Sequence, residues 1–257
     1  MFSRLPKPTI FAHRGASAYA PENTLAAFEL AVHQEADAIE LDAKLSSDDQ
    51  VVVIHDQTLE RTTNGTGYVR DMPLAALLEL DAGSHFDAAY ENENIPTLSQ
   101  VFETVGRKIF INIELTNYSS PNDSLPEKVA DLVNYHGLAR NVLFSSFHPK
   151  VLKRIHQLLP TVPIGFLICP GLSRVLVRTR FSRPLKDYQA IHIALQDTSQ
   201  ELIKMIHQPG HRANVYTVNR KEDMKRLFSY GVDGIFTDDP VRAREELVNH
   251  PSILQNE

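Results

Sequence analysis

The chain has 257 residues, of which 42% are apolar and 23% are charged, and this composition excludes intrinsic disorder as its main state. The length fits one or two domains, because α/β barrels commonly reach about 250 residues as a single unit. With 26 Lys and Arg against 32 Asp and Glu, the net charge is −6, which argues against nucleic acid or an anionic membrane as the main partner but leaves room for a local anion site.

Short β-branched or apolar segments recur along the chain and alternate with helical patterns. Nine of them predict strands: residues 9–12, 38–41, 51–54, 109–113, 142–144, 164–168, 190–194, 214–218 and 234–236. Strands that alternate with helices in this way predict a parallel sheet.

Loop length identifies one of the nine strands as an extra. Residues 44–50 alone separate the second strand from the third, whereas a parallel crossover needs a dozen or more residues. These two strands must therefore form an antiparallel hairpin that turns at residues 47–50. The other strands make eight βα units, so the sequence predicts an α/β fold of the (β/α)8 TIM-barrel type, with its active site at the carboxyl ends of the strands.

Residues 57–96 interrupt the alternation of strands and helices. Residues 62–67 are rich in turn formers, and residues 81–94 are polar and irregular. We expect an insertion at about 57–96 that forms a small cap. Since no repeat, low-complexity tract or linker marks a second unit, the sequence predicts one domain over residues 1–257.

Three carboxylates are predicted at the mouth of the barrel. Glu40 and Asp42 share one face of a strand, and Glu114 ends the next barrel strand at the same height. Carboxylates this close repel one another and need a cation, a proton or shared basic partners. Their oxygen atoms suit one Mg²⁺ or Ca²⁺, and the alternative is a set of salt bridges to nearby Arg and Lys.

Two histidines are predicted to reach the same mouth. His13 closes the first strand and His55 closes the returning strand of the hairpin. Histidine suits acid–base transfer at neutral pH, although a lone histidine is more often structural, which is how we interpret the other nine. Arg14 offers a forked donor to phosphate oxygens, or else an ion pair to Glu40 or Asp42.

A helix is expected to start after Asn23, its predicted N-cap, in the segment Ala-Pro-Glu-Asn-Thr at residues 20–24. Together, a metal that neutralises phosphate charge, an arginine, and one histidine each for attack and departure have the chemistry needed for phosphodiester cleavage.

An ordered set of motifs over about residues 10–245 resembles the glycerophosphodiester phosphodiesterase family. These motifs are His13-Arg-Gly15, Pro21-Glu-Asn-Thr24, Glu40-Leu-Asp42, His55-Asp56, Arg61-Thr-Thr63 with Gly65 and Gly67, Asn112-Ile-Glu114, Tyr216-Thr-Val-Asn219, Gly231-Val-Asp-Gly234 and Thr237-Asp238. Residues 43–45, 81–84 and 215–219 look most like the cytoplasmic bacterial branch, which processes diesters released from phospholipids.

The resemblance implies a TIM-type barrel that binds one Mg²⁺ or Ca²⁺ and hydrolyses glycerophosphodiesters to sn-glycerol 3-phosphate and an alcohol. It also implies roles within the site. His13 and His55 would be the acid–base pair, and Arg14 would bind the phosphate. The metal ligands would be Glu40, Asp42 and Glu114.

The chain departs from the family pattern after Glu114. Relatives usually have Glu-x-Lys there, whereas this chain has Thr116, so a cation that would face the substrate is missing. Either Lys44 compensates or the phosphate is held more weakly, and we favour the view that Thr116→Lys would lower KM. Tyr216 replaces the tryptophan of many relatives and should make a slightly more polar wall for the glycerol.

Two alternatives to a hydrolase stay open: a related lyase that forms a cyclic phosphate, and a catalytically weak barrel that binds glycerophosphodiesters. The single cysteine, Cys169, cannot form an internal disulfide, and residues 1–12 have no signal-peptide core. No apolar stretch is long enough to span a bilayer. We therefore expect a cytoplasmic enzyme of lipid and glycerol metabolism, with a small-molecule substrate and an oligomeric state that the sequence leaves open.

Overall fold

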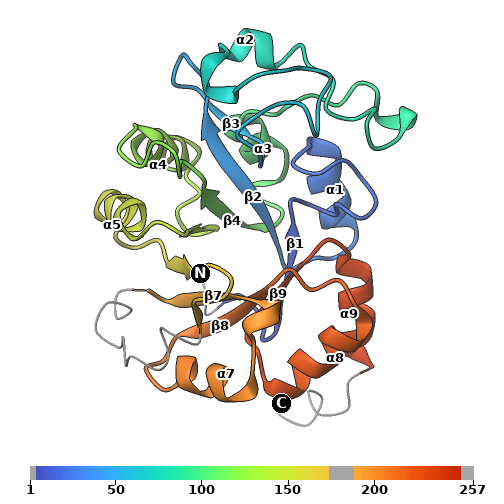
Figure 1. Ribbon diagram of the computed structural model, residues 1–257, viewed down its shortest axis with the longest axis vertical. Helices are drawn as coiled ribbons and strands as arrows, with labels where there is room; N and C mark the ends of the chain where they lie inside the picture. The colour runs from blue at the N-terminus through green and yellow to red at the C-terminus, as the bar shows by residue number, and fades with distance from the viewer. Residues whose placement is uncertain (1–3, 174–187, 250–257) are drawn as a thin grey trace.

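Eight parallel strands form a closed barrel in the computed structural model, which describes residues 4–173 and 188–249 (Figure 1). The barrel strands are β1 (Thr9–His13), β2 (Ala38–Leu45), β4 (Phe110–Leu115), β5 (Val142–Ser146), β6 (Ile164–Leu167), β7 (Ala190–Ala194), β8 (Arg212–Tyr216) and β9 (Gly234–Thr237). The ring closes because β1 pairs with both β2 and β9. The predicted (β/α)8 barrel is confirmed, and each predicted strand overlaps an observed one.

The ninth strand, β3 (Val51–Val53), is the returning arm of the predicted hairpin. It pairs antiparallel with the outer part of β2, so that Ala43 lies opposite Val53 and Leu45 lies opposite Val51. One further hydrogen bond, from Ile54 N to Asp42 O at 3.0 Å, continues this ladder toward the barrel. The hairpin thus leads the chain back to the mouth immediately before His55.

Helices surround the barrel and pack their apolar faces on the strands. They are α1 (Leu25–His33), α3 (Leu98–Val105), α4 (Leu125–His136), α5 (Pro149–Leu158), α7 (Gln200–His207), α8 (Lys221–Tyr230) and α9 (Pro240–Val248), with the 3₁₀ turn η4 (Leu195–Asp197) before α7. In α5, for example, the buried side chains are Val151, Leu152 and Ile155, which share one helical face. No helix within residues 4–173 and 188–249 is long and apolar enough to cross a membrane.

The segment between β3 and α3 lies beyond the outer end of β2, at the top of Figure 1. It contains η2 (Val69–Asp71), α2 (Leu74–Leu77) and η3 (Ala88–Tyr90). Isolated bridges join Thr58 to Tyr68 and Asp81 to Asn94. This segment has a small apolar cluster of its own, formed with the hairpin by Val52, Ile54, Leu59, Val69, Leu77, Ala82 and Ile95.

An apolar layer lies in the barrel interior below the mouth. Toward the amino ends of the strands, Phe11 stacks on Phe236 with ring centroids 4.6 Å apart, and Ala38 and Leu143 complete an apolar layer. Because side chains alternate along a strand, the inward positions nearer the carboxyl ends hold polar residues such as Glu40 and Asp42. This apolar layer lies beneath the polar mouth, and Phe236 belongs both to the layer and to the pocket lining described below.

Candidate active site

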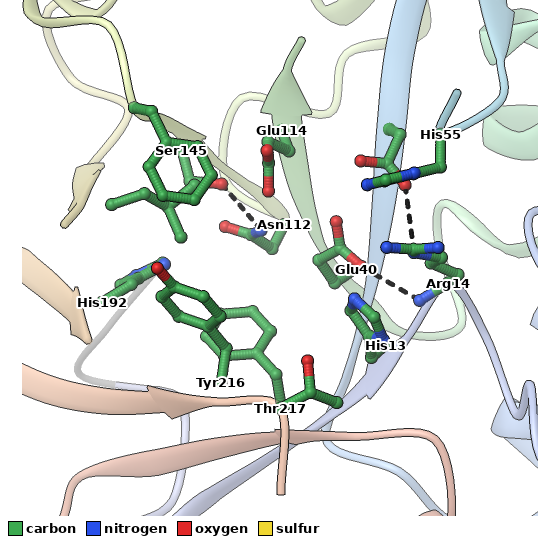
Figure 2. A pocket seen from close by; sticks show the side chains of 14 residues that line it. His13, Arg14, Glu40, His55, Asn112, Glu114, Ser145, His192, Tyr216 and Thr217 are labelled. Atoms are coloured by element: carbon green, nitrogen blue, oxygen red, sulfur yellow. Dashed lines mark hydrogen bonds and ion pairs between the residues drawn. The ribbon is translucent and has the colours of Figure 1, made fainter. Parts of the chain in front are cut away.

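The carboxyl ends of the strands surround a small pocket of about 240 Å³ (Figure 2). Its walls combine ionisable and aromatic side chains: His13, Arg14, Glu40, Asp42, His55, Asn112, Glu114, Ser145, Phe147, Leu167, His192, Tyr216, Thr217 and Phe236. All but one of the site residues predicted from the sequence lie in this lining. The exception is Thr116, whose side chain is buried between strands.

Strand register brings the three carboxylates together. Asp42 on β2 lies directly beside Glu114 on β4, and Glu40 precedes Asp42 by two residues on the same strand face. One oxygen from each carboxylate can be chosen so that all three lie within 4.8 Å of one another. This juxtaposition matches the cluster predicted from the sequence.

Each carboxylate is held by a protein donor through one of its oxygens. Oε2 of Glu40 accepts a hydrogen bond from the backbone N–H of Arg14 at 3.0 Å. Oε1 of Glu114 accepts one from the hydroxyl of Tyr118, a residue that the sequence reasoning did not single out. The opposite oxygens of these carboxylates accept no hydrogen bond from the described part of the chain, so they remain able to bind a ligand.

Burial makes the cluster electrostatically unfavourable without a cation. Burial and the negative charge of Asp42 raise the pKa of Glu40 well above its usual value, and the same two causes raise the pKa of Glu114 to about 7. Arg14 is the nearest guanidinium, but it is shared with other acids. Three hard oxygen donors with too little positive charge around them fit a divalent cation such as Mg²⁺ or Ca²⁺.

Asn23 supports the cluster instead of capping the helix, so its predicted role as N-cap was wrong. Thr24 caps α1 by accepting a hydrogen bond from Ala27 N. Asn23 has a positive φ of 59°, and its Nδ2 donates to Asp42 Oδ2 at 2.9 Å. Both residues are good N-caps, and the contact with Asp42 explains why the helix starts one residue later.

His13 is oriented by a carboxylate from the opposite end of the chain. Its Nδ1 lies 2.7 Å from Asp238 Oδ1, and Asn219 Nδ2 donates to the other oxygen of Asp238. Burial raises the pKa of Asp238, but the contacts with His13 and Asn219 outweigh it and bring the pKa below its usual value. Asp238 is therefore a carboxylate that accepts from Nδ1–H, which leaves Nε2 of His13 as the nitrogen available for proton transfer.

His55 has an equivalent carboxylate next to it in the sequence. Its Nδ1 lies 2.6 Å from Asp56 Oδ1. Arg61 holds Asp56 through two hydrogen bonds, of 2.7 Å from Nε and 3.0 Å from Nη2. The hydrogen bonds from Arg61 are the main reason why the pKa of Asp56 lies well below its usual value. The side chain of His55 is thus fixed in the same manner as that of His13.

An ion-pair network links these residues to Arg14. Glu22 accepts from both Nη atoms of Arg61 at 2.8 Å and from Arg14 Nη1 at 2.8 Å. Burial raises the pKa of Glu22, but the two guanidiniums lower it to about 2. Arg14 Nε also lies 3.5 Å from Asp42, so an ion pair to the acidic cluster, which the sequence left as an alternative, is present.

Lys44 contacts Thr116, the residue at which the sequence departs from the expected family pattern. Its Nζ donates to Thr116 Oγ1 at 2.7 Å, and Thr116 Oγ1 donates to the carbonyl of Ala43 at 2.8 Å. Burial lowers the pKa of Lys44, whereas the nearby charges of Asp42 and Glu114 oppose this effect. The structure therefore has a buried lysine in contact with Thr116 and close enough to Asp42 and Glu114 to interact with their charges.

Aromatic side chains form the wall away from the carboxylates. Tyr216 packs edge-on against Phe147, with ring centroids 6.0 Å apart, and its hydroxyl donates to the carbonyl of Ile168 at 2.5 Å. Because this hydroxyl is occupied, Tyr216 presents mainly its ring to the pocket.

The comparisons with known proteins all indicate one family. A family model described as "Glycerophosphoryl diester phosphodiesterase family" matches residues 13–242. A glycerophosphodiester phosphodiesterase of Caldanaerobacter subterraneus subsp. tengcongensis is 38% identical over 244 residues, which cover 95% of this chain and 97% of that protein. The enzyme of the same name from Bacillus altitudinis is 37% identical over 243 residues, which cover 93% and 98%.

A solved structure has the same fold and a bound product. It is an Oleispira antarctica phosphodiesterase in complex with the product sn-glycerol-3-phosphate. Its TM-score is 0.84 and its sequence identity is 29%, over 94% of this chain and 97% of that chain.

Proposed function

The chain belongs to the glycerophosphodiester phosphodiesterase family and is a phosphodiesterase, and on this premise we propose that it is a metal-dependent hydrolase with a pair of acid–base histidines. Its substrates are glycerophosphodiesters, and its products are sn-glycerol 3-phosphate and an alcohol. One observation carries the proposal: three clustered carboxylates share a pocket with two histidines, each of which has a carboxylate on Nδ1.

Glu40, Asp42 and Glu114 would hold one Mg²⁺ or Ca²⁺. When bound, the cation neutralises negative charge on the phosphate and acts as a Lewis acid. The carboxylates supply the negative charge for this cation, while Asn23 and Tyr118 fix the orientation of two of them.

His13 and His55 would move the protons. One Nε2 takes a proton from the attacking water, and the other donates a proton to the oxygen of the departing alcohol. The water oxygen forms a bond to phosphorus while the bond from phosphorus to the alcohol oxygen breaks. Asp238 and Asp56 keep each Nδ1 protonated and stabilise the imidazolium form.

Arg14 would bind the phosphate. Its guanidinium lines the pocket and is held on one side by Glu22, so that its remaining N–H groups can donate to phosphate oxygens. Thr116, which lies outside the pocket lining, would act on the substrate only through Lys44, and Tyr216 would contact the glycerol with its ring.

The test is release of sn-glycerol 3-phosphate from glycerophosphocholine by metal-free protein to which Mg²⁺ or Ca²⁺ is added back. We expect activity only with the cation, and phosphorus NMR should show a monoester as the first product. A cyclic phosphate would instead indicate a lyase, and binding without turnover would indicate a barrel that only binds diesters. Panels with choline, ethanolamine, glycerol and inositol head groups would identify the preferred alcohol.

We also propose that the enzyme acts in the cytoplasm on diesters released from phospholipids, as its resemblance to the cytoplasmic bacterial branch suggests. Cell fractionation and the accumulation of glycerophosphodiesters in a deletion strain would test this role.

A further inference from the structure

His192 is a buried polar residue of the pocket that the proposed mechanism does not use. It lies on β7, is fully buried, and lines the pocket on the side across from Glu40, His13 and Arg14 (Figure 2). Neither of its ring nitrogens has a hydrogen-bond partner among residues 4–173 and 188–249. An unsatisfied buried polar group is costly, so a ligand or water is expected to complete it.

The imidazole of His192 occupies the space that a side chain at Gly165 would need. A Cβ atom on Gly165 of the neighbouring strand β6 would lie 2.5 Å from Nε2 of His192. On another side, the ring of Phe236 packs with its centroid 4.9 Å from that of His192. An apolar side chain would fill this space without the cost of desolvating two nitrogens, so simple packing does not account for histidine here.

The imidazole is neutral at physiological pH. Burial lowers the pKa of His192 to about 3, and no carboxylate contacts its ring in the described part of the chain. A neutral imidazole offers one N–H donor and one acceptor nitrogen. Such a group matches a hydroxyl, which also donates and accepts, better than it matches a phosphate.

Asn112 adds a second unsatisfied atom to the same pocket. Its Nδ2 donates to Ser145 Oγ at 2.9 Å, while its buried Oδ1 has no partner among the described residues. Asn112 Oδ1 can only accept, so a ligand group that donates would satisfy it. The lining of the pocket therefore includes two uncharged side chains with unpaired polar atoms, His192 and Asn112, in addition to its charged half.

We propose that His192, together with Asn112, binds the hydroxyl groups of the glycerol moiety and selects phosphodiesters that carry a polyol. This inference rests on the proposed function and assigns the orientation of the substrate: the phosphate lies at the carboxylates and Arg14, and the glycerol lies at His192.

Asn214 provides a matched control. It is fully buried on β8 beside His192, both of its side-chain polar atoms lack partners among the described residues, and a Cβ on Gly234 would lie 2.8 Å from its Oδ1. It is not part of the pocket lining. If the polar atoms of His192 serve only to hold internal water, the two residues should behave alike.

The experiment compares the binding of sn-glycerol 3-phosphate with that of propyl phosphate, which has the same phosphate and three carbons but no hydroxyls. Dissociation constants are measured by titration calorimetry at one fixed Ca²⁺ concentration for the wild type, His192→Leu, His192→Gln and Asn214→Leu. We expect the wild type to prefer sn-glycerol 3-phosphate by roughly tenfold or more, because a site built to hydrogen-bond hydroxyls rejects an analogue without them.

His192→Leu should abolish this preference by weakening the binding of sn-glycerol 3-phosphate but not that of propyl phosphate. His192→Gln, which keeps a donor and an acceptor, should retain part of it, and Asn214→Leu should retain all of it. An unchanged preference in His192→Leu, or an equal loss in Asn214→Leu, would overturn the inference. If no His192 variant folds, His192 is a structural residue and the inference is likewise overturned. A wild type that binds neither ester would instead reject the proposed function itself.

Discussion

Lys44 and Thr116 form a hydrogen bond of 2.7 Å between the neighbouring strands β2 and β4. Of the two alternatives that the sequence leaves open, this contact favours the one in which Lys44 compensates for the lysine missing at position 116. Its electrostatic neighbours are Asp42 and Glu114, two of the three clustered carboxylates. We therefore expect the positive charge of Lys44 to act on the same carboxylates that a lysine at position 116 would approach.

This contact reverses the expected effect of Thr116→Lys. A second ammonium would be placed next to that of Lys44, where two like charges at about 4 Å repel by about 4 kcal/mol at an effective dielectric constant of 20. We expect KM for glycerophosphocholine to rise and kcat/KM to fall at least about tenfold. Steady-state kinetics at saturating Mg²⁺ measures both.

Exchanging the side chains at positions 44 and 116 tests whether the number of positive charges or their position matters. The double variant Lys44→Thr/Thr116→Lys carries one ammonium, as the wild type does, and should recover most of the activity that Thr116→Lys loses. Lys44→Met is the matched control that removes the charge. A lower KM in the single variant Thr116→Lys would show that Lys44 does not serve the site.

Metal binding should depend on pH through Glu114. In the metal-free protein its pKa is about 7, raised from its usual 4.5 by burial and by Asp42. Between these two values the folded state binds a proton that the unfolded chain has released, so the free energy of unfolding falls as pH rises through this window. Because a cation needs the ionised carboxylates, added Mg²⁺ should raise Tm little at pH 5 and clearly at pH 8. A metal-induced shift in Tm that does not vary with pH would contradict this.

Glu40→Gln should weaken the metal site while it stabilises the metal-free fold. The amide keeps the shape of the side chain but removes one of three clustered negative charges, so the apparent dissociation constant for Mg²⁺ should rise at least about tenfold. Titration followed by Tm measures this constant without turnover. The exposed Glu29 on α1 provides the control Glu29→Gln, which should leave the titration unchanged.

His13→Ala and His55→Ala should each lower kcat at least ~100-fold while the barrel stays folded. Residues that act in one proton-transfer sequence are not additive, so the double variant should lose less than the product of the single losses. The exposed His85 supplies the control His85→Ala. Strictly multiplicative losses would mean that the two histidines serve separate functions.

Arg61→Met should reduce turnover although Arg61 does not line the pocket. Four hydrogen bonds of 2.7–3.0 Å join its guanidinium to Asp56 and Glu22, which hold His55 and Arg14. We expect kcat to fall about tenfold, and Arg61→Lys to recover little because an ammonium cannot bind two carboxylates in a bidentate manner. Arg70→Met, at an exposed ion pair of 3.7 Å with Asp71, is the control and should be silent.

Much of the fold is legible in the sequence because its signals are local. The short connection before Val51 excludes a parallel crossover whatever the rest of the chain does, and it identified the hairpin correctly. Strand ends were less well predicted. The strand β8 starts at Arg212, two residues before the predicted start. A charged side chain there is typical of a loop, but the guanidinium of Arg212 is buried and donates to the carbonyl of Leu5 and to Thr9.

The candidate site was predictable as a set of residue types but not as a network. Glu40, Asp42 and His55 follow from strand pleating within one hairpin. The partner of His13 is Asp238, 225 residues away, and no periodicity relates the two. The same holds for Tyr118 at Glu114, which belongs to a loop that follows β4. The first contact depends on the pairing of β1 with β9 that closes the barrel, and the second on the path of the loop after β4, neither of which one sequence specifies pair by pair.

The hairpin of β2 and β3 also constrains how many residues can lie between Val51 and His55. Because Ile54 N bonds to Asp42 O, a predicted metal ligand and the residue before His55 are aligned on one ladder. One residue inserted between Val51 and His55 would turn the imidazole to the opposite face of the strand, whereas two would return it to the original face. Natural or engineered variants of this enzyme should therefore gain or lose residues between Val51 and His55 only in even numbers. The turn at 46–50 lies outside this constraint.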